Sequence, residues 1–168
     1  MRLRQRIRWG VLPVYLCFVV SSATAGEWLT DKSGCQVWDP NPQLEETVAW
    51  SGRCVNGRAE GAGSVAWSKN GTAFETDQGE WRDGKQVGKG VQNWPVGRYQ
   101  GEIADGLPNG QGVLTLPKFR YEGQFRDGKP NGSGKLIQGA ETVSGTWKDG
   151  CLQGPRKAAI GIPLSACK

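Results

Sequence analysis

The 168-residue sequence contains no histidine. This absence excludes Ser-His and Cys-His nucleophile systems, and it removes the commonest side-chain ligand of metal ions. Hydrolytic chemistry would then depend on carboxylates, such as the recurring Glu80, Glu102 and Glu122. The aspartates that recur before glycine favour a structural reading instead, since an Asp-Gly pair suits a tight turn. We therefore expect a protein without enzymatic activity, metal or cofactor.

The sequence also lacks an apolar run long enough to span a bilayer comfortably. The run Gly10–Val20 is short; it follows four arginines and precedes Ala23-Thr24-Ala25, a small-x-small cleavage pattern. This order predicts a signal peptide over residues 1–25, cleaved near Ala25, with a retained membrane anchor as the alternative. The expected location of the mature protein is the periplasm or the exterior of the cell.

Little net charge remains once the predicted signal is removed. The chain has 21 basic and 16 acidic residues, and the loss of four arginines leaves 17 basic residues against 16 acidic ones. A near-neutral chain has no large electrostatic footprint for nucleic acid, and its attraction to anionic lipid is weak. We expect no nucleic-acid partner.

Glycine, in contrast, is abundant, and its spacing is regular. Four sets of four glycines share separations of five, four and two residues, and a fifth set breaks off at Pro155. The first glycine of each set lies 27 residues, and then three times 22 residues, after the previous one: Gly52, Gly79, Gly101, Gly123 and Gly145. A constant period of this length indicates a repeat array.

Each unit has the pattern of a β-hairpin. In Tyr121–Phe125 the two aromatic residues and a glycine alternate with polar residues, which places them on one face of a strand. Asp127-Gly128 then supplies a hairpin turn. Glycines on the same face leave room for the aromatic rings of a neighbouring hairpin. The sequence therefore predicts an all-β fold, an elongated single-layer antiparallel sheet of tandem hairpins.

The repeated pattern Tyr-x-Gly-x-(Phe/Trp)-x-Asp-Gly-x-x-x-Gly-x-Gly resembles the MORN repeat (membrane occupation and recognition nexus) over about residues 48–155. Tyr121–Ile137 matches it fully, and Tyr99–Leu116 departs at Ile103. Three other units replace the leading tyrosine, by Trp50, Asp77 and Val143. Atypical terminal units are common in repeat arrays. Together with the predicted signal, the resemblance suggests an exported bacterial member of this family.

Four cysteines follow the predicted signal, and an even number in an exported chain argues for disulfides. Cys54 and Cys151 lie four hairpins apart, which is roughly 40 Å at about 4.8 Å per strand. A disulfide allows only about 7 Å between Cα atoms. We therefore predict the pairs Cys35–Cys54 and Cys151–Cys167, which staple the two ends. The predicted organisation is a signal peptide (1–25), an N-terminal cap (26–47), the array (48–155) and a C-terminal cap (156–168).

The aromatic residues support two interpretations. In the first, most of them form a packed spine between hairpins. In the second, one face forms an apolar groove for an extended peptide or a partner helix; its candidate residues are Trp81, Tyr99, Ile103, Tyr121, Phe125 and Trp147. The MORN resemblance implies a scaffold with a protein partner, and a homo-oligomer stays open. The alternatives are an envelope module that binds glycan or peptidoglycan on aromatic platforms, or one that binds phospholipid headgroups.

Overall fold

A computed structural model describes residues 26–167; the predicted signal peptide lies outside this range. The described residues form thirteen strands and a short 3₁₀ helix, η1. These elements are β1 (Glu27–Thr30), β2 (Gln36–Asp39), β3 (Glu46–Trp50), β4 (Arg53–Val55), β5 (Arg58–Lys69), β6 (Thr72–Arg82), β7 (Lys85–Trp94), β8 (Gly97–Ala104), β9 (Leu107–Leu116), β10 (Phe119–Arg126), β11 (Lys129–Gln138), β12 (Glu141–Lys148), β13 (Cys151–Leu152) and η1 (Leu164–Ala166).

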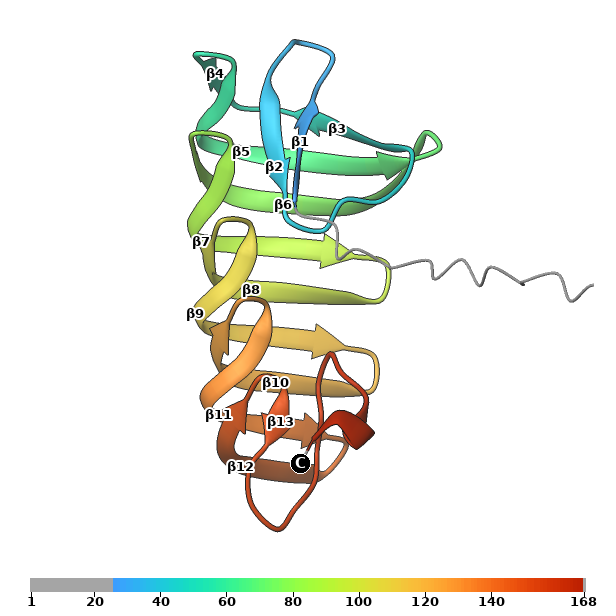
Figure 1. The fold of residues 1–168 in the computed structure, drawn as a ribbon, viewed down its shortest axis with the longest axis vertical. Helices are drawn as coiled ribbons and strands as arrows, with labels where there is room; N and C mark the ends of the chain where they lie inside the picture. Colours follow the sequence, from blue (N-terminus) through green and yellow to red (C-terminus); the bar gives the residue numbers. More distant parts are fainter. Residues whose placement is uncertain (1–25, 168) are drawn as a thin grey trace, which may run out of the picture.

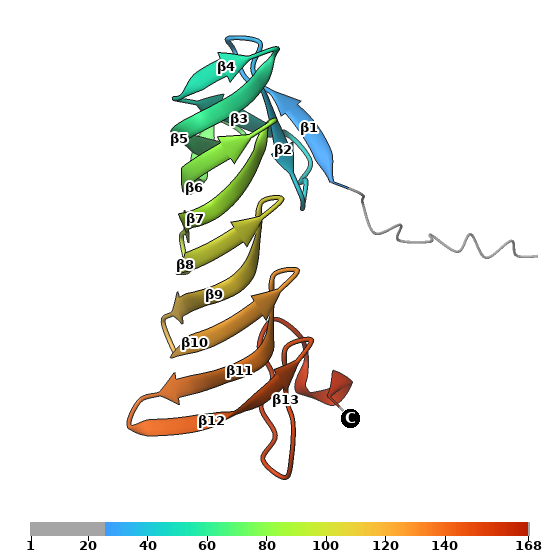
Figure 2. The same ribbon diagram turned by 90° about the vertical axis from the view of Figure 1, so that its left-hand side faces the viewer.

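The strands form one elongated sheet, in which each strand from β5 to β13 pairs with the next (Figure 1). These pairings are antiparallel, and a parallel contact occurs where β2 meets β5 through Gln36 and Arg58. In the turned view the sheet is a single layer, and the β1–β2 hairpin and the C-terminal segment lie on the same side of it (Figure 2). The predicted all-β class and hairpin array are confirmed. No helix among residues 26–167 is long and apolar enough to cross a membrane.

The Asp-Gly pairs form the turns on one edge of the sheet, as predicted. Asp83, Asp105, Asp127 and Asp149 have φ between 49° and 51°, and the glycine after each has φ between 77° and 88°. Hairpin turns with two positive φ angles match the twist of the flanking strands, and aspartate and glycine tolerate this conformation. The aspartates are therefore explained by the backbone.

A second set of hydrogen bonds joins these turns to one another. The turn glycine of each unit donates its N–H to a carbonyl of the preceding unit: Gly84 to Ala59 (2.9 Å), Gly106 to Gln86 (3.1 Å), Gly128 to Pro108 (3.0 Å) and Gly150 to Pro130 (2.9 Å). We call this series the turn ladder. Both caps continue it, because Trp38 donates to the Gly84 carbonyl (2.8 Å) and Ile160 to the Gly150 carbonyl (2.9 Å). Neighbouring units are thus fixed at the turns as well as along their strands.

The one longer repeat interval lengthens a single hairpin. β5 and β6 contain 12 and 11 residues, whereas β9 and β10 contain 10 and 8. The extra residues extend the hairpin to a tip at Asn70-Gly71, on the edge opposite the turn ladder, and the hairpin reaches beyond its neighbours (Figure 1). The insertion therefore leaves the turn ladder intact.

Both predicted disulfides are present. Cys35 and Cys54 have Cα atoms 5.8 Å apart, and Cys151 and Cys167 have Cα atoms 5.5 Å apart. The first joins Cys35, the residue before β2, to β4 at the start of the sheet, and the second ties the segment after η1 to β13. Each bridge holds a cap to its end of the array.

The buried apolar residues form two clusters. One contains Val37, Val48, Val65, Trp67 and Trp81, and the other contains Tyr99, Ile103, Tyr121, Phe125 and Trp147, each with smaller neighbours. Buried polar side chains of β6 and β7, namely Asp77, Gln86 and Gln92, lie between them in the repeat. The face of the sheet that carries these residues therefore changes from apolar to polar and back along the length of the array.

Candidate functional site

The six residues predicted to line an apolar groove lie on one face of the sheet, here called the inner face. Their exposed fractions run from 0% to 4%, and the set is Trp81, Tyr99, Ile103, Tyr121, Phe125 and Trp147. The first of them belongs to the N-terminal cluster, and the other five belong to the C-terminal cluster. The structure thus brings most of the set together, but as packed interior.

The contacts within this set join successive units. Tyr99 meets Phe125 with ring centroids 5.1 Å apart, and Tyr121 meets Trp147 at 5.1 Å, both edge to face. In the same relation, Trp50 of the first unit contacts Trp81 of the second at 4.8 Å. The leading aromatic residue of one unit therefore packs on the second aromatic residue of the next. We call this series the aromatic spine.

Glycine and a β-bulge complete the packing of each tyrosine. A Cβ atom added to Gly112 or Gly134 would overlap the ring of Tyr99 or Tyr121, so these glycines let the rings lie on the backbone. The Tyr99 hydroxyl donates to the Glu102 carbonyl (2.8 Å) at the bulge between Gly101 and Ile103. Burial raises the pKa of Tyr121 to about 12 and that of Tyr99 still higher. Both hydroxyls therefore stay protonated donors.

This burial bears on partner binding. Side chains that expose so little surface make poor direct contacts for another molecule. Binding of a partner through the six groove residues remains a prediction.

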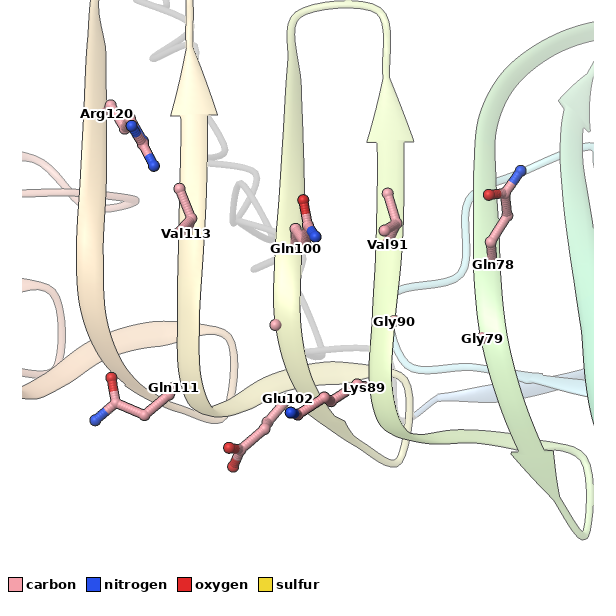
Figure 3. A pocket seen from close by; sticks show the side chains of 11 residues that line it. Gln78, Gly79, Lys89, Gly90, Val91, Gln100, Glu102, Gln111, Val113 and Arg120 are labelled. Atoms are coloured by element: carbon pink, nitrogen blue, oxygen red, sulfur yellow. The ribbon is translucent and has the colours of Figure 1, made fainter.

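The opposite, outer face carries two adjoining hollows of about 780 and 670 Å³ that share Gln111. The first spans β6 to β10, and the second spans β9 to β12. Figure 3 shows the first, with two rows of side chains standing on either side of the glycine positions. The glycines between the rows have their Cβ positions on the inner face, where a Cβ atom on Gly112 or Gly134 would meet a tyrosine ring, so the hollow is the space between the two outward-facing rows. We call the two hollows together the outer trough, and its lining side chains are Gln78, Lys89, Val91, Gln100, Glu102, Gln111, Val113, Arg120, Glu122, Ser133, Lys135, Ser144 and Thr146.

Charges of both signs line the outer trough. Glu122 forms ion pairs with Arg120 (2.9 Å) and Lys135 (2.7 Å). The hydrogen bond from Lys135, and then the charge of Arg120, lower the pKa of Glu122, so this carboxylate stays ionised. In the neighbouring unit Lys89 lies opposite Glu102 in the strand register. The trough therefore offers paired charges and amides to a ligand.

The sequence holds a signal for the trough that the sequence analysis did not use. Gln100 and Glu102 alternate with the buried Tyr99 and Ile103, so the period of two that places the spine inside also places these residues outside. Their polar character alone is ordinary for a solvated face. The hollow becomes visible only when the outward-facing residues of neighbouring strands are aligned.

The inner face has one polar interruption, in the second unit. Asp77 occupies the position held by tyrosine in the next two units, and its Oδ2 accepts a hydrogen bond from Trp67 Nε1 (2.7 Å). Gln92 Nε2 donates to Gln86 Oε1 (3.1 Å) and to the Gly106 carbonyl (2.9 Å). No group of three or more acidic or cysteine side chains within residues 26–167 is arranged to hold a metal ion.

The fold defines a protein of tandem β-hairpin repeats. A family comparison matches the MORN repeat to three consecutive segments, residues 78–97, 99–118 and 121–138, which run from β6 to β11. These three segments are similar to the MORN repeat, a repeat that generally acts as a module of protein or membrane interaction. The search of curated proteins gave no match.

Proposed function

We propose that this chain is an exported, non-enzymatic interaction module that binds an extended segment of a partner protein along the outer trough. The observation that carries the proposal is the continuity of the trough across β6 to β12, at right angles to the strands. An extended peptide in the trough would contact outward-facing side chains of both rows in each successive unit. Solenoid repeats commonly present such elongated surfaces to their partners.

The chemistry of the trough favours peptide over the alternatives. Its three cations, Lys89, Arg120 and Lys135, are largely offset by Glu102 and Glu122, so a bilayer of anionic headgroups meets only a small net positive charge. Among the described residues that line it there is no aromatic ring for a sugar to stack on. Amides, paired charges and the two valines suit a polypeptide with mixed side chains.

Export is supported by the cysteines. Two disulfides in a small chain fit an oxidising compartment. The predicted signal peptide, which lies outside the described residues, would direct the chain to export. We place the mature protein in the bacterial periplasm or outside the cell.

Site-specific photocrosslinking in the native cell tests the binding surface. A photoreactive residue replaces Gln100 or Val113 in the trough, and the matched control carries it at Leu44, an exposed cap residue that does not line the trough. We expect a discrete crosslinked protein from the two trough positions and none from the control. A product of twice the chain mass would identify the partner as a second copy.

Two results would contradict the proposal. Equal crosslinking from the trough and the control would mean that the trough has no selectivity. Crosslinks confined to lipid or peptidoglycan would favour the envelope-ligand alternative, which salt-sensitive liposome flotation and retention on peptidoglycan then separate.

A further inference from the structure

A cavity of about 270 Å³ lies between the N-terminal cap and the inner face of the sheet. One wall is the connection from β2 to β3, which passes in front of β6 and β7 (Figure 1). The other walls come from the long β5–β6 hairpin, from β7 and from two hairpin turns. This cavity is separate from the outer trough, since the two share no lining residue.

Four carboxyl groups line the cavity: Asp39, Glu46, Glu75 and Asp77. Asp77 is 5% exposed, and while its Oδ2 accepts the Trp67 indole N–H, its Oδ1 has no hydrogen-bond partner. A buried carboxylate oxygen without a partner is costly, and such groups in native structures call for an explanation. The unmatched oxygen indicates a missing donor.

Basic side chains of the neighbouring strands do not supply that donor. Lys69 lies opposite Glu46 in the strand register, and Lys85 pairs with Asp105 at 3.3 Å. None of the ion pairs found among residues 26–167 includes any of the four carboxyl groups. The other polar residues of the lining, Asn41, Gln43 and Gln92, are neutral. The cavity thus gathers negative charge without a counter-charge of its own.

Burial and mutual repulsion raise the pKa values of these carboxyl groups. Burial, followed by the charges of Asp77 and Asp39, raises the pKa of Glu75 to about 8. Burial likewise raises the pKa of Asp77 and of Glu46 to about 7. A cation in the cavity would relieve the repulsion and hold the carboxylates ionised.

The remaining lining indicates which kind of cation fits. No three of the carboxyl groups are arranged to ligate a metal ion. The aromatic side chains Trp67, Phe74 and Trp94 instead form part of the wall. Aromatic faces combined with carboxylates are the usual recognition elements for an organic ammonium group. The volume of about 270 Å³ is below that of a typical drug-sized site, so it suits a single side chain or a small amine.

We propose that this cavity is a binding site for an organic ammonium group, in which Asp77 and Glu75 balance the charge and Trp67, Phe74 and Trp94 enclose the alkyl or methyl groups. The ammonium group comes either from a small free amine or from a lysine side chain of a protein. Asp77 Oδ1 accepts one of its N–H bonds. The site goes beyond the function proposed for the outer trough and does not depend on it.

Titration of the ¹⁵N-labelled mature protein at pH 8 with n-butylammonium chloride tests the proposal, followed through the indole N–H signal of Trp67. We expect a saturable shift with a dissociation constant on the order of 1 mM, given the few atoms of the probe. Asp77→Asn and Glu75→Gln should each weaken binding about tenfold or more, because each removes a charge that faces the ligand. Glu141→Gln, an exposed carboxyl on β12, is the matched control and should bind like the wild type.

The pH dependence tests the role of the carboxylates, and the choice of probe distinguishes the two sources of the ammonium group. Binding should weaken from pH 8 to pH 5, because Glu46, Glu75 and Asp77, with their raised pKa values, take up protons while the amine stays charged. A short peptide with one lysine that binds more tightly than n-butylammonium, when its acetyl-lysine form does not bind, would assign the site to a protein side chain. Equal affinity of the peptide and n-butylammonium would assign it to small amines.

Several outcomes would overturn the proposal. These are a wild-type signal that does not shift, a shift that sodium chloride reproduces at equal ionic strength, tighter binding of calcium than of the amine, or unchanged affinity in both variants. Native dispersion of the other indole signals shows that each variant is folded. If Asp77→Asn is not folded, Glu75→Gln decides the question, since Glu75 makes no hydrogen bond to the Trp67 indole.

Discussion

The second and fourth hairpin units share their glycine spacing and their turns but differ in how they fill the inner face. In the fourth unit, Tyr121 packs edge to face on Trp147 and hydrogen-bonds to the Gln124 carbonyl (3.2 Å). In the second unit, Asp77 stands at the equivalent position and lines a cavity instead. The leading position of the repeat can therefore either stabilise the array or bind a ligand.

The difference has a structural cause outside the repeat pattern. The second unit lies beside the N-terminal cap and contains the lengthened end of β6, so Phe74 and the β2–β3 connection surround Asp77. The fourth unit has neighbouring hairpins on both sides, and its inner face is occupied by the aromatic spine alone. A polar residue on the inner face is thus confined to the unit where another segment can shield it.

The largest effect is expected when the polar residue of the second unit is placed in the fourth. Tyr121→Asp should lower the free energy of unfolding by more than about 4 kcal/mol, because the carboxylate would be buried without the indole donor that Asp77 has. Tyr121→Phe, which loses only the hydroxyl, should cost about 1 kcal/mol. Denaturant unfolding monitored by circular dichroism measures both. Similar stabilities for the two variants would show that the inner face is far less dry than its burial indicates.

A methyl group on the glycine beneath the ring tests the same contrast. Gly134→Ala should destabilise by about 3 kcal/mol, because its Cβ atom would overlap Tyr121. Gly90→Ala in the second unit should cost less, about 2 kcal/mol, since one close neighbour of the added Cβ is the Gln78 backbone carbonyl but the other two, Gln86 Nε2 and Ile103 Cδ1, are movable side-chain ends. Thermal unfolding compares the pair directly. Equal losses of stability would mean that glycine is required by the backbone conformation at these positions and not by the tyrosine ring.

The pH dependence of stability separates the two regions chemically. The raised pKa values of Glu75, Asp77 and Glu46 mean that the folded state binds protons more tightly than the unfolded state between about pH 4.5 and 8. Stability is therefore greatest at the acidic end and falls as pH rises through this range. We expect a loss of about 2 kcal/mol from pH 5 to pH 8 without added amine, after allowance for partial exposure.

Glu75→Gln should reduce that slope, and Glu141→Gln should leave it unchanged. The measurement is a series of urea titrations from pH 5 to pH 8. Stability that rises with pH in the wild type would show that these carboxyl groups are paired with cations in the native state.

The smallest effect is expected on the outer face. Lys135→Met should change the free energy of unfolding by less than about 0.5 kcal/mol, because exposed ion pairs contribute little. The same substitution should weaken crosslinking from Val113 if Lys135 contacts the partner. A large loss of stability would give the Glu122 ion pairs a structural role.

The sequence predicted the features that depend on local backbone chemistry. The glycine period located the hairpins β6–β7, β8–β9, β10–β11 and β12–β13, and the Asp-Gly pairs located their turns. The short reach of a disulfide selected the correct pairs, Cys35–Cys54 and Cys151–Cys167. Alternation also placed Tyr99, Tyr121 and Trp147 on one face. It could not say how much of each ring the next hairpin would cover, because that depends on packing between units and not on the period within a strand.

The cavity was not predictable in the same way. Asp77 was visible as a departure from the pattern, but its surroundings depend on where the β2–β3 connection lies. That connection contains Pro40 and Pro42 and is positioned by tertiary contacts, not by its own periodicity. The β5–β6 extension was undetermined for the same reason, since its residues add length without repeating the glycine signal.

The turn ladder also governs how such a chain can change in size over evolution. Every turn glycine bonds to the unit before it, so duplication of a whole 22-residue cassette restores each bond, whereas a partial duplication breaks the series at the joint. Cassettes between the two disulfide-held ends would each add two strands, or about 10 Å, to the distance between the caps. The protein is in this sense a spacer whose length can be set only in whole steps, and the five extra residues of β5 and β6 mark the edge where growth is free of that constraint.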